Sequence, residues 1–582
     1  MKKHYDFIVV GGGSAGCVLA NRLSLNPKNE VLVLEAGRSD YRFDFRLHMP
    51  AALTYPLASR LYNWWYESDP EPYMNNRRVY QPRGKVLGGS SCINGMIYIR
   101  GNALDYQKWA GSPGLENWDY AHCLPYFIRF ESRLKGADAF HGAGGPLYLT
   151  SGECDNPLFG AFLKAVQEAG YPLTRDVNGY RQEGFGIFDR TTYRGRRWSA
   201  SRAYYHPVKH RANLTLKTRS LASRILFEGK RAVGVEYFRG KRRERVYGRE
   251  ILCCGGAINS PHLLQLSGIG NAAELEKLGI RVIEDLPGVG ENLQDHLEVY
   301  VQYACKKPVS IYPALKPWNQ LRIGYEWLFK RKGLGATNHF EAGGFIRSND
   351  SVAYPNLQYH FLPIAIRYDG KVANQSHGYQ VHVGPMNTDV RGRIKIRSTD
   401  PTIYPSIRFN YLSTEQERRE WVEAIRCTRN IMTRPAFDSF RGPELAPGTE
   451  AQSDEEILDF IAKEGESAYH PSCTCKMGEN DETAVVDSRL KVRGVKGLRV
   501  VDASAMPTIT NGNIYAPVMM IAEKAADEIL GNTPLPALDI GFYRHRKEDG
   551  PKTASAPAAP ETEAPPSAAA SADDLDRKKA VG

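Results

Sequence analysis

Residues 5–16 read YDFIVVGGGSAG, and residues 32–37 read LVLEAG. In the first stretch a short apolar run leads into the pattern G-x-G-x-x-G, and a helix-like segment follows over residues 17–23. The second stretch is another apolar run, which ends in Glu35, 24 residues after Gly11. Strand, glycine turn, helix, strand and acid in this order are typical of a unit that binds a dinucleotide.

Each glycine of the pattern has its own expected role. Gly11 permits the tight turn, Gly13 lets backbone N–H groups approach the pyrophosphate, and Gly16 lets the helix pack closely on the strand. The helix N-terminus adds partial positive charge, and Glu35 can accept hydrogen bonds from a ribose. The residues predicted here to bind the cofactor are Gly11, Gly13, Ser14, Ala15, Gly16, Glu35 and Ala36. The pattern does not separate FAD from NAD, and a purely structural glycine turn is the alternative.

The bulk composition is that of a large globular enzyme. Of the 582 residues, 42% are hydrophobic and 24% are charged, and this length predicts more than one domain. The net charge of +11 is partly local, as in the run RGKRR at residues 239–243, which we interpret as a solvated hairpin turn. No recognition-helix, RNA-binding or zinc-finger pattern accompanies that run, so nucleic acid is not an expected partner.

The cysteines and apolar runs bear on the cellular compartment. The ten cysteines lack the spacing of a disulfide framework, and no paired CxxC sets are present, so we expect no metal site. The one early apolar run, residues 7–10, belongs to the first strand, and we therefore expect no signal peptide. The sequence contains no run of about 18 apolar residues, so we expect no membrane-spanning helix. These observations predict a reducing, cytoplasmic location.

The rest of the chain divides into two styles. Strand-like runs continue the α/β style at residues 214–217, 232–238, 250–254 and 498–502. Residues 300–465 are instead rich in Tyr, Trp, Phe and Pro, with alternating runs typical of an antiparallel sheet. We predict an α/β fold with a discontinuous Rossmann-like cofactor domain and a substrate-binding domain built on an antiparallel sheet with helices. The predicted ranges are 1–155, 196–300 and 466–535 for the cofactor domain, 156–195 and 301–465 for the substrate domain, and 546–582 for a disordered Ala/Pro-rich tail.

Two further blocks carry a specific family resemblance. Residues 84–107 read GKVLGGSSCINGMIYIRGNALDYQ, and residues 256–270 read GAINSPHLLQLSGIG. Both resemble the signature patterns of the glucose–methanol–choline oxidoreductases, and the resemblance extends over residues 4–532. It implies FAD as cofactor, with further contacts from Gly88, Gly89, Asn94 and Gly95. Some relatives attach the flavin covalently through a histidine where this chain has Ile93, so the resemblance implies non-covalent FAD.

Several shorter stretches resemble the choline-oxidising members of the family. They include residues 69–78 (DPEPYMNNRR), 293–298 (LQDHLE), 338–345 (NHFEAGGF) and 469–478 (YHPSCTCKMG). The implied reaction is oxidation of choline to betaine aldehyde, and onward to glycine betaine through the aldehyde hydrate. Relatives that oxidise aliphatic alcohols or polyethylene glycol share much of this sequence, so an uncharged alcohol is one alternative. A non-oxidising flavin-binding protein or light-driven decarboxylase on the same fold is another.

The resemblance also implies a catalytic pair. His470 coincides with the family's catalytic histidine, which acts as the base for the hydroxyl proton. Asn513 matches a second catalytic position, where its amide can stabilise a developing alkoxide but cannot take a proton. The alternatives are an ordinary hydrogen-bonding histidine and an asparagine that caps the helix beginning near Pro517.

A quaternary ammonium has no N–H donor, so its site needs carboxylate charge and aromatic faces. We expect Glu341 to bind the cation, with Tyr469 as one wall and Trp65, or its neighbour Trp64, as another. For Glu341 the alternative is a salt bridge to a nearby basic residue, and for the tryptophans it is ordinary packing. Near the flavin the resemblance adds two residues, Asp502 and Ala503.

Residues 312–332 mix aromatic with basic side chains. Such a segment is typical of a surface that faces anionic lipid. Since family dehydrogenases pass electrons to membrane quinones, we expect a quinone or another acceptor as partner, with peripheral association at the inner face of the cell membrane. A substrate-access lid or an ordinary packed helix is the alternative.

Overall fold

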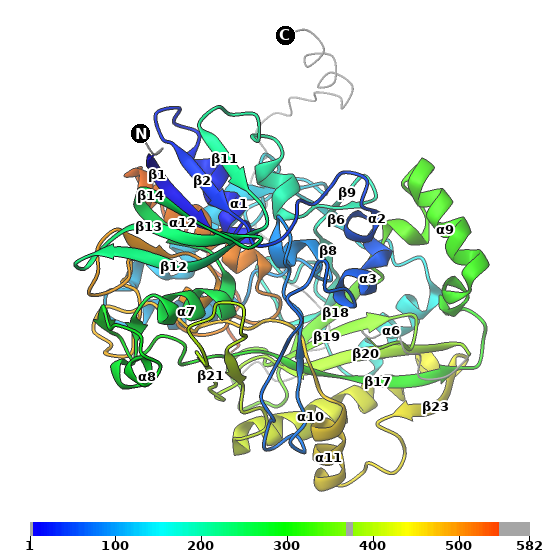
Figure 1. Ribbon diagram of the computed structural model, residues 1–582. Coiled ribbons are helices and arrows are strands. Elements are labelled where there is room, and N and C mark those ends of the chain that lie inside the picture. Colours follow the sequence, from blue (N-terminus) through cyan, green and yellow to red (C-terminus); the bar gives the residue numbers. More distant parts are fainter. Residues whose placement is uncertain (1–3, 368–375, 546–582) are drawn as a thin grey trace. The chain divides into compact units, whose positions relative to one another are not determined.

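The parallel part of the fold is a seven-stranded sheet (Figure 1) that begins at the N-terminal strand. The structure is a computed structural model that describes residues 4–367 and 376–545. The strands of this sheet, in spatial order, are β11 (Leu214–Lys217), β2 (Val31–Leu34), β1 (His4–Val10), β14 (Arg242–Cys253), β13 (Arg231–Arg239) and β12 (Ser220–Glu228), with β25 (Leu498–Val500) on β14. The pairs β1–β2, β2–β11, β1–β14 and β14–β25 are parallel, whereas β12, β13 and β14 form an antiparallel meander.

Apolar runs explain why this sheet lies at the centre of its layer. β2 is buried along its whole length, as is the second half of β1, so their side chains pack on both faces of the sheet. Helix α1 (Ser14–Leu23) packs on β1 and β2, and α12 (Tyr515–Leu530) packs on α1. Between β13 and β14 the basic run at residues 239–243 forms the predicted hairpin turn.

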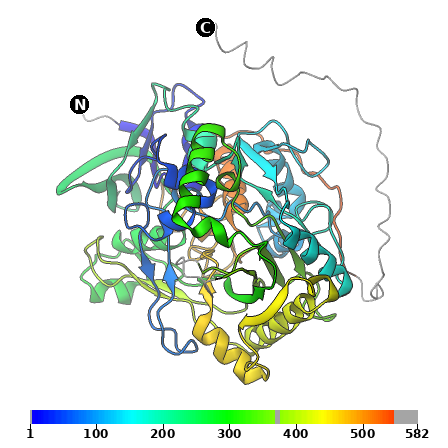
Figure 2. The same ribbon diagram turned by 90° about the vertical axis from the view of Figure 1, so that its right-hand side faces the viewer.

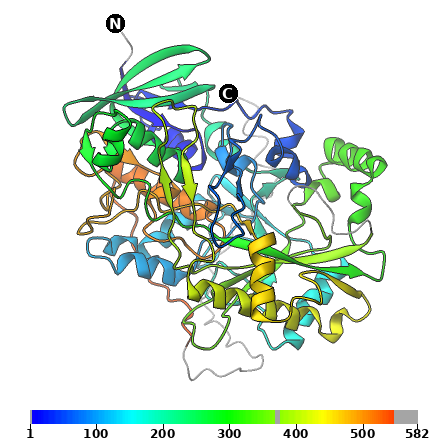
Figure 3. The ribbon, with the colours of Figure 1, turned by 60° about the horizontal axis from the view of Figure 1, so that its bottom comes forward.

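A second seven-stranded sheet is antiparallel and forms the other layer. Its strands are β23 (Arg441–Ala446), β17 (Leu297–Cys305), β20 (Gly378–Pro385), β19 (Leu357–Leu362), β18 (Ala342–Ile346) and β7 (Gly184–Ile187), with β24 (Glu466–Ser467) on β17. α10 (Glu415–Met432) packs on β20 of this sheet and α11 (Asp454–Glu464) packs on α10, and Figure 3 shows both helices beside the sheet. α6 (Pro157–Glu168) adds Phe162, whose ring stacks on Phe361 of β19 with centroids 4.6 Å apart. This antiparallel sheet with its helices confirms the predicted fold class.

Shorter elements connect and flank the two layers. In Figure 2, α9 (Pro317–Lys330) lies beside the segment that contains α2 (Phe45–His48) and α3 (Thr54–Leu57). The other helices are α4 (Ala103–Ala110), α5 (Tyr120–Phe130), α7 (Gly256–Leu266) and α8 (Ala272–Lys277). The other strands are β3 (Tyr66–Glu67), β4 (Tyr80–Gln81), β5 (Glu131–Arg133), β6 (Leu147–Ser151), β8 (Asp189–Arg190), β9 (Thr192–Tyr193), β10 (Arg196–Arg197), β15 (Ile269–Gly270), β16 (Glu284–Asp285), β21 (Arg393–Lys395) and β22 (Ser406–Arg408).

The parallel sheet is built from three parts of the chain that lie far apart in the sequence, as a discontinuous domain requires. The predicted domain boundaries themselves stay predictions, and β17 runs across the one at residue 300. The predicted tail, residues 546–582, lies outside the described residues. All ten cysteines are unpaired thiols. Among helices within residues 4–367 and 376–545, none has the length and apolar character needed to cross a membrane.

Candidate active site

A single elongated cavity joins the predicted cofactor and substrate residues. It contains about 2090 Å³ of empty space, including its open mouth. The carboxyl ends of β1 and β2 and the N-terminus of α1 line it, as expected for a ligand site on a parallel sheet. His470, Asn513 and Tyr469 line the same cavity. The fold therefore brings together residues that are separated by almost the whole chain.

The dinucleotide part of the cavity fits the glycine pattern. A Cβ added to Gly11, whose φ is +108°, would lie 2.4 Å from the carbonyl oxygen of Cys254. A Cβ at Gly16 would lie 1.9 Å from the carbonyl oxygen of Gly11, so this glycine sets the close contact of helix and strand. At Gly13 the nearest neighbours would be 3.9 Å away, which leaves room for a ligand beside the N-terminus of α1.

Most predicted cofactor residues line the cavity, and two do not. The lining includes Gly11, Gly13, Ser14, Ala15, Glu35, Ala36, Gly89, Asn94, Gly95, Asp502 and Ala503. Gly16 is structural, as expected from its contact with Gly11. Gly88 was predicted to contact the cofactor and is instead a turn residue with φ of +96°, packed against Ser201 and Cys92. Its role is to let the backbone turn, and the prediction of a direct contact is not supported.

Two buried carboxylates stand in the cofactor part. Glu35 accepts backbone N–H bonds from Gly12 (2.8 Å) and Gly37 (2.6 Å), and burial raises its pKa to about 7. Asp502 accepts from the Gly256 N–H (2.8 Å) and the Ser260 hydroxyl (2.6 Å), and burial likewise raises its pKa. Each oxygen of Glu35 retains a further lone pair that a ribose hydroxyl can use. The second oxygen of Asp502 accepts from the backbone N–H (2.8 Å) and the hydroxyl (2.5 Å) of Ser504, so all four of its lone pairs are engaged.

His470 lies where Asp295, just before β17, holds its backbone. The His470 N–H donates to Asp295 Oδ1 at 2.7 Å, and Tyr411 OH donates to Asp295 Oδ2 at 2.6 Å. The ring of His470 then makes two contacts, 3.0 Å from Nδ1 to His296 Nδ1 and 3.1 Å from Nε2 to Asn513 Nδ2. One backbone bond and two ring contacts therefore fix the position of the imidazole.

The hydrogen-bond partners assign the proton positions of this network. His296 Nε2 lies 3.1 Å from the carbonyl oxygen of Met386, which can only accept, so Nε2 of His296 carries the proton. Its Nδ1 is then the acceptor for Nδ1–H of His470. At the other end Gln358 donates to Asn513 Oδ1 at 3.2 Å, which turns the Asn513 amide N–H toward His470. His470 Nε2 is consequently left unprotonated, with its lone pair toward the cavity-lining amide of Asn513.

Burial keeps the three neighbouring histidines neutral. It lowers the pKa of His470 well below its ordinary value, and His296, Arg83 and His360 lower it further. Burial lowers the pKa of His296 to about 3 and that of His360 to about 4. A neutral imidazole with an available Nε2 is the form that a general base requires.

Glu298 of β17 supplies a carboxylate to the same cavity. Its one ion-pair partner among the described residues is His382, whose Nδ1 lies 3.2 Å from Glu298 Oε1. The Gln380 amide donates to the Ile366 carbonyl (2.8 Å) and to His382 Nε2 (2.7 Å). His382 therefore carries its proton on Nδ1 and is uncharged. The negative charge of Glu298 thus meets a neutral donor inside the cavity.

Glu341 was predicted to bind a cation, and the structure contradicts this prediction. Its Oε1 lies 2.9 Å from Arg190 Nη1 and also accepts from the Thr337 hydroxyl, while its Oε2 accepts from the Cys154 N–H at 2.6 Å. The side chain is absent from the described residues that line the cavity. The alternative, a salt bridge to a basic residue, is the arrangement found.

The two adjacent tryptophans separate. Trp64 lines the cavity and stacks on Tyr66, with centroids 5.9 Å apart. Trp65 has a φ of +65° and packs edge-on against Tyr80 under the Arg60 guanidinium, away from the cavity lining. The prediction of Trp65 as a substrate wall is therefore wrong, whereas Tyr469 does line the cavity.

The sequence interpretation missed Glu298, His296 and His360. The first two lie in the stretch LQDHLE at residues 293–298, which was recognised as a block but given no roles. An acid and a histidine two residues apart at the start of a buried strand would have been the signal. His360 carries no comparable local signal, because it reaches the site only through the pairing of β19 with β20.

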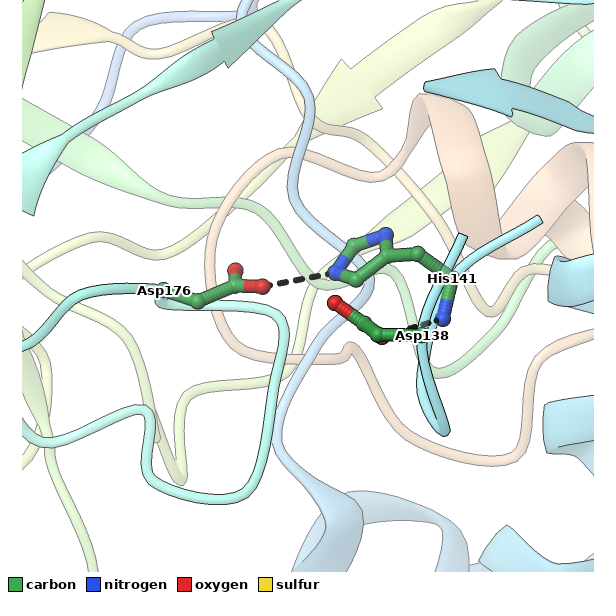
Figure 4. A group of neighbouring side chains, drawn as sticks. All are labelled: Asp138, His141 and Asp176. Carbon is green, nitrogen blue, oxygen red and sulfur yellow. Dashed lines mark hydrogen bonds and ion pairs between the residues drawn. The ribbon is translucent and has the colours of Figure 1, made fainter. Parts of the chain in front are cut away.

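A separate group, Asp138, His141 and Asp176, has the ligand types of a metal site (Figure 4). Arg133 already lies within it, 3.2 Å from Asp138 and 3.1 Å from Asp176. His141 contacts Asp176 at 2.7 Å, and although burial opposes protonation, the carboxylates Asp176 and Glu131 raise the His141 pKa. The carboxylates are thus neutralised by neighbouring cations, and we interpret the group as an ion-pair network.

The chain is similar to several known proteins. The chain is 56% identical over 553 residues to two proteins named oxygen-dependent choline dehydrogenase, from Staphylococcus saprophyticus and Staphylococcus xylosus, and the match covers 94% of this chain and 99% of theirs. Among solved structures, pyridoxine 4-oxidase from Mesorbium loti superposes with a TM-score of 0.82 at 32% identity, covering 91% of this chain and 100% of that one. A formate oxidase variant from Aspergillus oryzae gives 0.85 at 26% identity, covering 91% and 98%.

Family models give the same assignment. A model described as GMC oxidoreductase matches residues 5–298, and a second with the same description matches residues 388–522. The first range contains the two glycine blocks, and the second contains His470 and Asn513. The resemblance predicted from the sequence is confirmed, and the chain belongs to the GMC oxidoreductase family.

Proposed function

We propose that the chain is an FAD-dependent dehydrogenase that oxidises choline to betaine aldehyde, and onward to glycine betaine through the aldehyde hydrate. The relatives at 56% identity carry a name that specifies choline. The observation that carries the proposal is the carboxylate of Glu298 in the cavity that also holds His470 and Asn513. An uncharged alcohol would gain nothing from a buried carboxylate whose partner is a neutral histidine.

The substrate cation fits the surroundings of Glu298. A trimethylammonium group is recognised by charge and by aromatic faces, each ring contributing about 0.5–2 kcal/mol. Tyr469 and Phe340 line the cavity with Glu298. Burial, Glu466 and Glu298 together raise the pKa of Tyr469, so its hydroxyl stays neutral. Phe340 packs edge-on against His382, the partner of Glu298, with centroids 5.4 Å apart. We assign the cation to this group in place of Glu341.

The protein's own groups carry the proton in the proposed reaction. FAD, when bound, supplies the acceptor for the hydride that leaves the carbinol carbon. His470 Nε2 takes the hydroxyl proton, a role that contributes about 10²–10⁴-fold in rate. The substrate hydroxyl displaces the Asn513 N–H from Nε2 as it gives up its proton there, and the displaced N–H then donates to the substrate oxygen. His470 Nδ1–H keeps its hydrogen bond to His296 Nδ1 throughout the reaction, so the ring does not rotate.

We also propose that FAD is bound without a covalent link. Ile93 lines the cavity where some relatives have a histidine, and a hydrocarbon side chain cannot form that bond. The residues expected to hold FAD are those of the glycine pattern and the second glycine block, with Glu35 and Asp502. Acid precipitation of the yellow protein should leave the flavin in the supernatant. A yellow pellet would instead indicate a covalent attachment.

The electron acceptor is the least constrained part of the proposal. We propose a cytoplasmic enzyme attached peripherally to the inner face of the cell membrane, where a quinone takes the electrons. The relatives' name specifies oxygen, so molecular oxygen is the competing acceptor. Parallel assays of oxygen consumption and of reduction of a soluble quinone, at equal choline concentration, separate the two.

An anaerobic mixing experiment tests the proposed reaction and its two rivals. Purified holoenzyme is mixed with choline, betaine aldehyde, ethanol, a longer aliphatic alcohol or a glycol, and the bleaching of the flavin absorbance is followed in time. We expect fast bleaching by choline and slow or absent bleaching by the neutral alcohols. Bleaching by neutral alcohols alone would favour an uncharged substrate. Absence of bleaching by every compound in the dark would favour a non-oxidising flavoprotein.

A further inference from the structure

Helix α9 presents apolar side chains to solvent on one side. Trp318 is 82% exposed and Phe329 is 67% exposed, and Leu321, Tyr325 and Leu328 are each more than half exposed. At helical spacing these five residues share one side, which we call the α9 stripe. The helix buries its opposite side, Ile323 and Trp327, against the protein. A surface helix ordinarily exposes polar residues there, so the α9 stripe needs an explanation.

The exposure does not come from a poorly anchored helix. Trp327 Nε1 donates to the carbonyl oxygen of Gly195 at 2.7 Å. A Cβ added to Gly335 would lie 2.8 Å from both Trp327 Cβ and Met49 Cε, so α9 and the segment after α2 close on this glycine from two sides. The guanidinium of Arg331 lies over the Trp327 ring, 4.2 Å from its centroid. α9 is held by its inner side, and its apolar stripe points outward.

A second group of exposed apolar side chains belongs to the segment next to α9. Phe43 is 87% exposed and Phe45 is 45% exposed, and they belong to the segment that Figure 2 shows next to α9. Basic residues occur in both segments. Residues 316–332 carry five lysines and arginines and one acid, Glu326. Burial together with Arg202, Arg331 and Arg42 lowers the pKa of Arg196 to about 10, which places positive charges from both segments close together.

We propose that the α9 stripe, with Phe43 and Phe45, inserts into the surface of an anionic lipid bilayer while the surrounding basic residues contact the headgroups. Aromatic and leucine side chains flanked by lysine and arginine are the composition of helices that lie in a membrane interface. Each basic residue near anionic lipid strengthens binding. The proposal specifies a surface for the peripheral association proposed above, on which it rests, and it is independent of the alcohol oxidised.

Two other roles fit the area less well. A symmetric contact with a second copy would place two basic rims against each other, since a two-fold interface uses the same patch twice. A substrate lid would line the cavity, and no residue of α9 is among the described residues that do so. Charge complementarity therefore favours lipid.

Vesicle flotation of the full-length holoenzyme tests the proposal. One set of vesicles contains equimolar phosphatidylglycerol and phosphatidylcholine, and the other contains phosphatidylcholine alone. We expect binding to the anionic set only, and weaker binding as NaCl rises from about 0.1 M to about 0.5 M. The variant W318S/L321S/F329S should bind at least about tenfold more weakly. The matched control L25S/L134S replaces two leucines that are 54% and 56% exposed elsewhere and should bind like the wild type.

Anaerobic bleaching by choline is measured on the same samples, because it reports folding and flavin loading and separates this inference from the proposed reaction. Protein that is bleached by choline but does not float with anionic vesicles, or a triple variant that floats like the wild type, would overturn the inference. A dimer in sedimentation that the triple variant dissociates, without vesicle binding, would also overturn it and assign the area to a second copy. Flotation without bleaching would support the lipid surface and count against the proposed reaction.

Discussion

Glu298 and Glu341 are two buried carboxylates of the antiparallel layer, one in β17 and one just before β18, and they differ in what neutralises them. Glu341, next to β18, is 6% exposed and is held by Arg190, Thr337 and the Cys154 N–H. Glu298, in β17, is 4% exposed, and its ion-pair partner in the described part of the chain is the uncharged His382. The charge of Glu341 is neutralised by Arg190, whereas Glu298 keeps its charge beside the cavity.

This difference teaches how to separate a structural carboxylate from a binding one. Burial penalises both ions equally, so the discriminating quantity is the charge of the partner rather than the depth of the site. An arginine compensates Glu341 and leaves nothing for a ligand. A neutral histidine holds the orientation of Glu298 without cancelling its charge, so an organic cation can complete the pair.

The largest effect should come from replacing His470, the proposed base, in a variant that keeps both carboxylates. We expect His470→Ala to slow anaerobic flavin reduction by choline by about 10²–10⁴-fold, because the variant lacks the nitrogen proposed to take the hydroxyl proton. The dissociation constant for choline should change little, since Glu298 is intact. Rapid-mixing spectroscopy gives both quantities. The exposed His210→Ala is the matched control, and a loss of less than tenfold in His470→Ala would exclude it as the base.

The next effect separates the carboxylates by stability. Glu341→Gln should destabilise the fold by about 3–5 kcal/mol, because Arg190 is left buried without its ion. Glu298→Gln keeps an oxygen that can accept from His382 Nδ1–H and only weakens that bond, so we expect a loss of about 1 kcal/mol. Chemical denaturation of the two variants measures the contrast. Equal losses would mean that the two sites are not different in the way described.

A smaller effect concerns the histidine that holds the tautomer of His470. We expect His296→Leu to slow flavin reduction about tenfold with little change in choline binding, since the acceptor for His470 Nδ1–H is lost. His296→Gln should recover most of the rate, because the Gln Oε1 can accept from His470 Nδ1–H while its Nε2 donates to the Met386 carbonyl. If the two variants were equally impaired, His296 would have a packing role only.

The smallest expected effect is that of pH, which should leave the limiting rate of flavin reduction unchanged in the neutral range. Burial, His296, Arg83 and His360 lower the pKa of His470, so the base is unprotonated throughout the neutral range. We expect the limiting rate of flavin reduction to stay constant from about pH 8 to about pH 6. A sigmoidal loss of rate centred near the ordinary histidine pKa would show that His470 is not held neutral.

The sequence predicts the parallel layer and points to His470 and Asn513, which meet in one cavity, because their signals are local. The glycine pattern, the apolar runs of β1 and β2, and the motifs around His470 and Asn513 each lie within a few residues. Glu341 was misassigned because Arg190, the residue that neutralises it, is 151 residues away in the chain.

Backbone conformation and packing direction account for the other differences. Trp64 and Trp65 are adjacent, and only the positive φ of Trp65 shows which ring turns from the cavity. For α9, the composition was compatible with a lipid-facing surface, a substrate-access lid or an ordinary packed helix. The burial of Ile323 and Trp327 establishes which side of this helix faces outward.

The central claim is that Glu298 selects a cationic alcohol, and one ratio tests it most directly. The ratio compares flavin reduction per dissociation constant for choline with that for 3,3-dimethylbutan-1-ol, which has the same shape without the charge. We expect a preference for choline of about 10²-fold or more in the wild type. It should nearly vanish in Glu298→Gln and persist in folded Glu341→Gln. Persistence in Glu298→Gln, or loss in Glu341→Gln alone, would contradict the account.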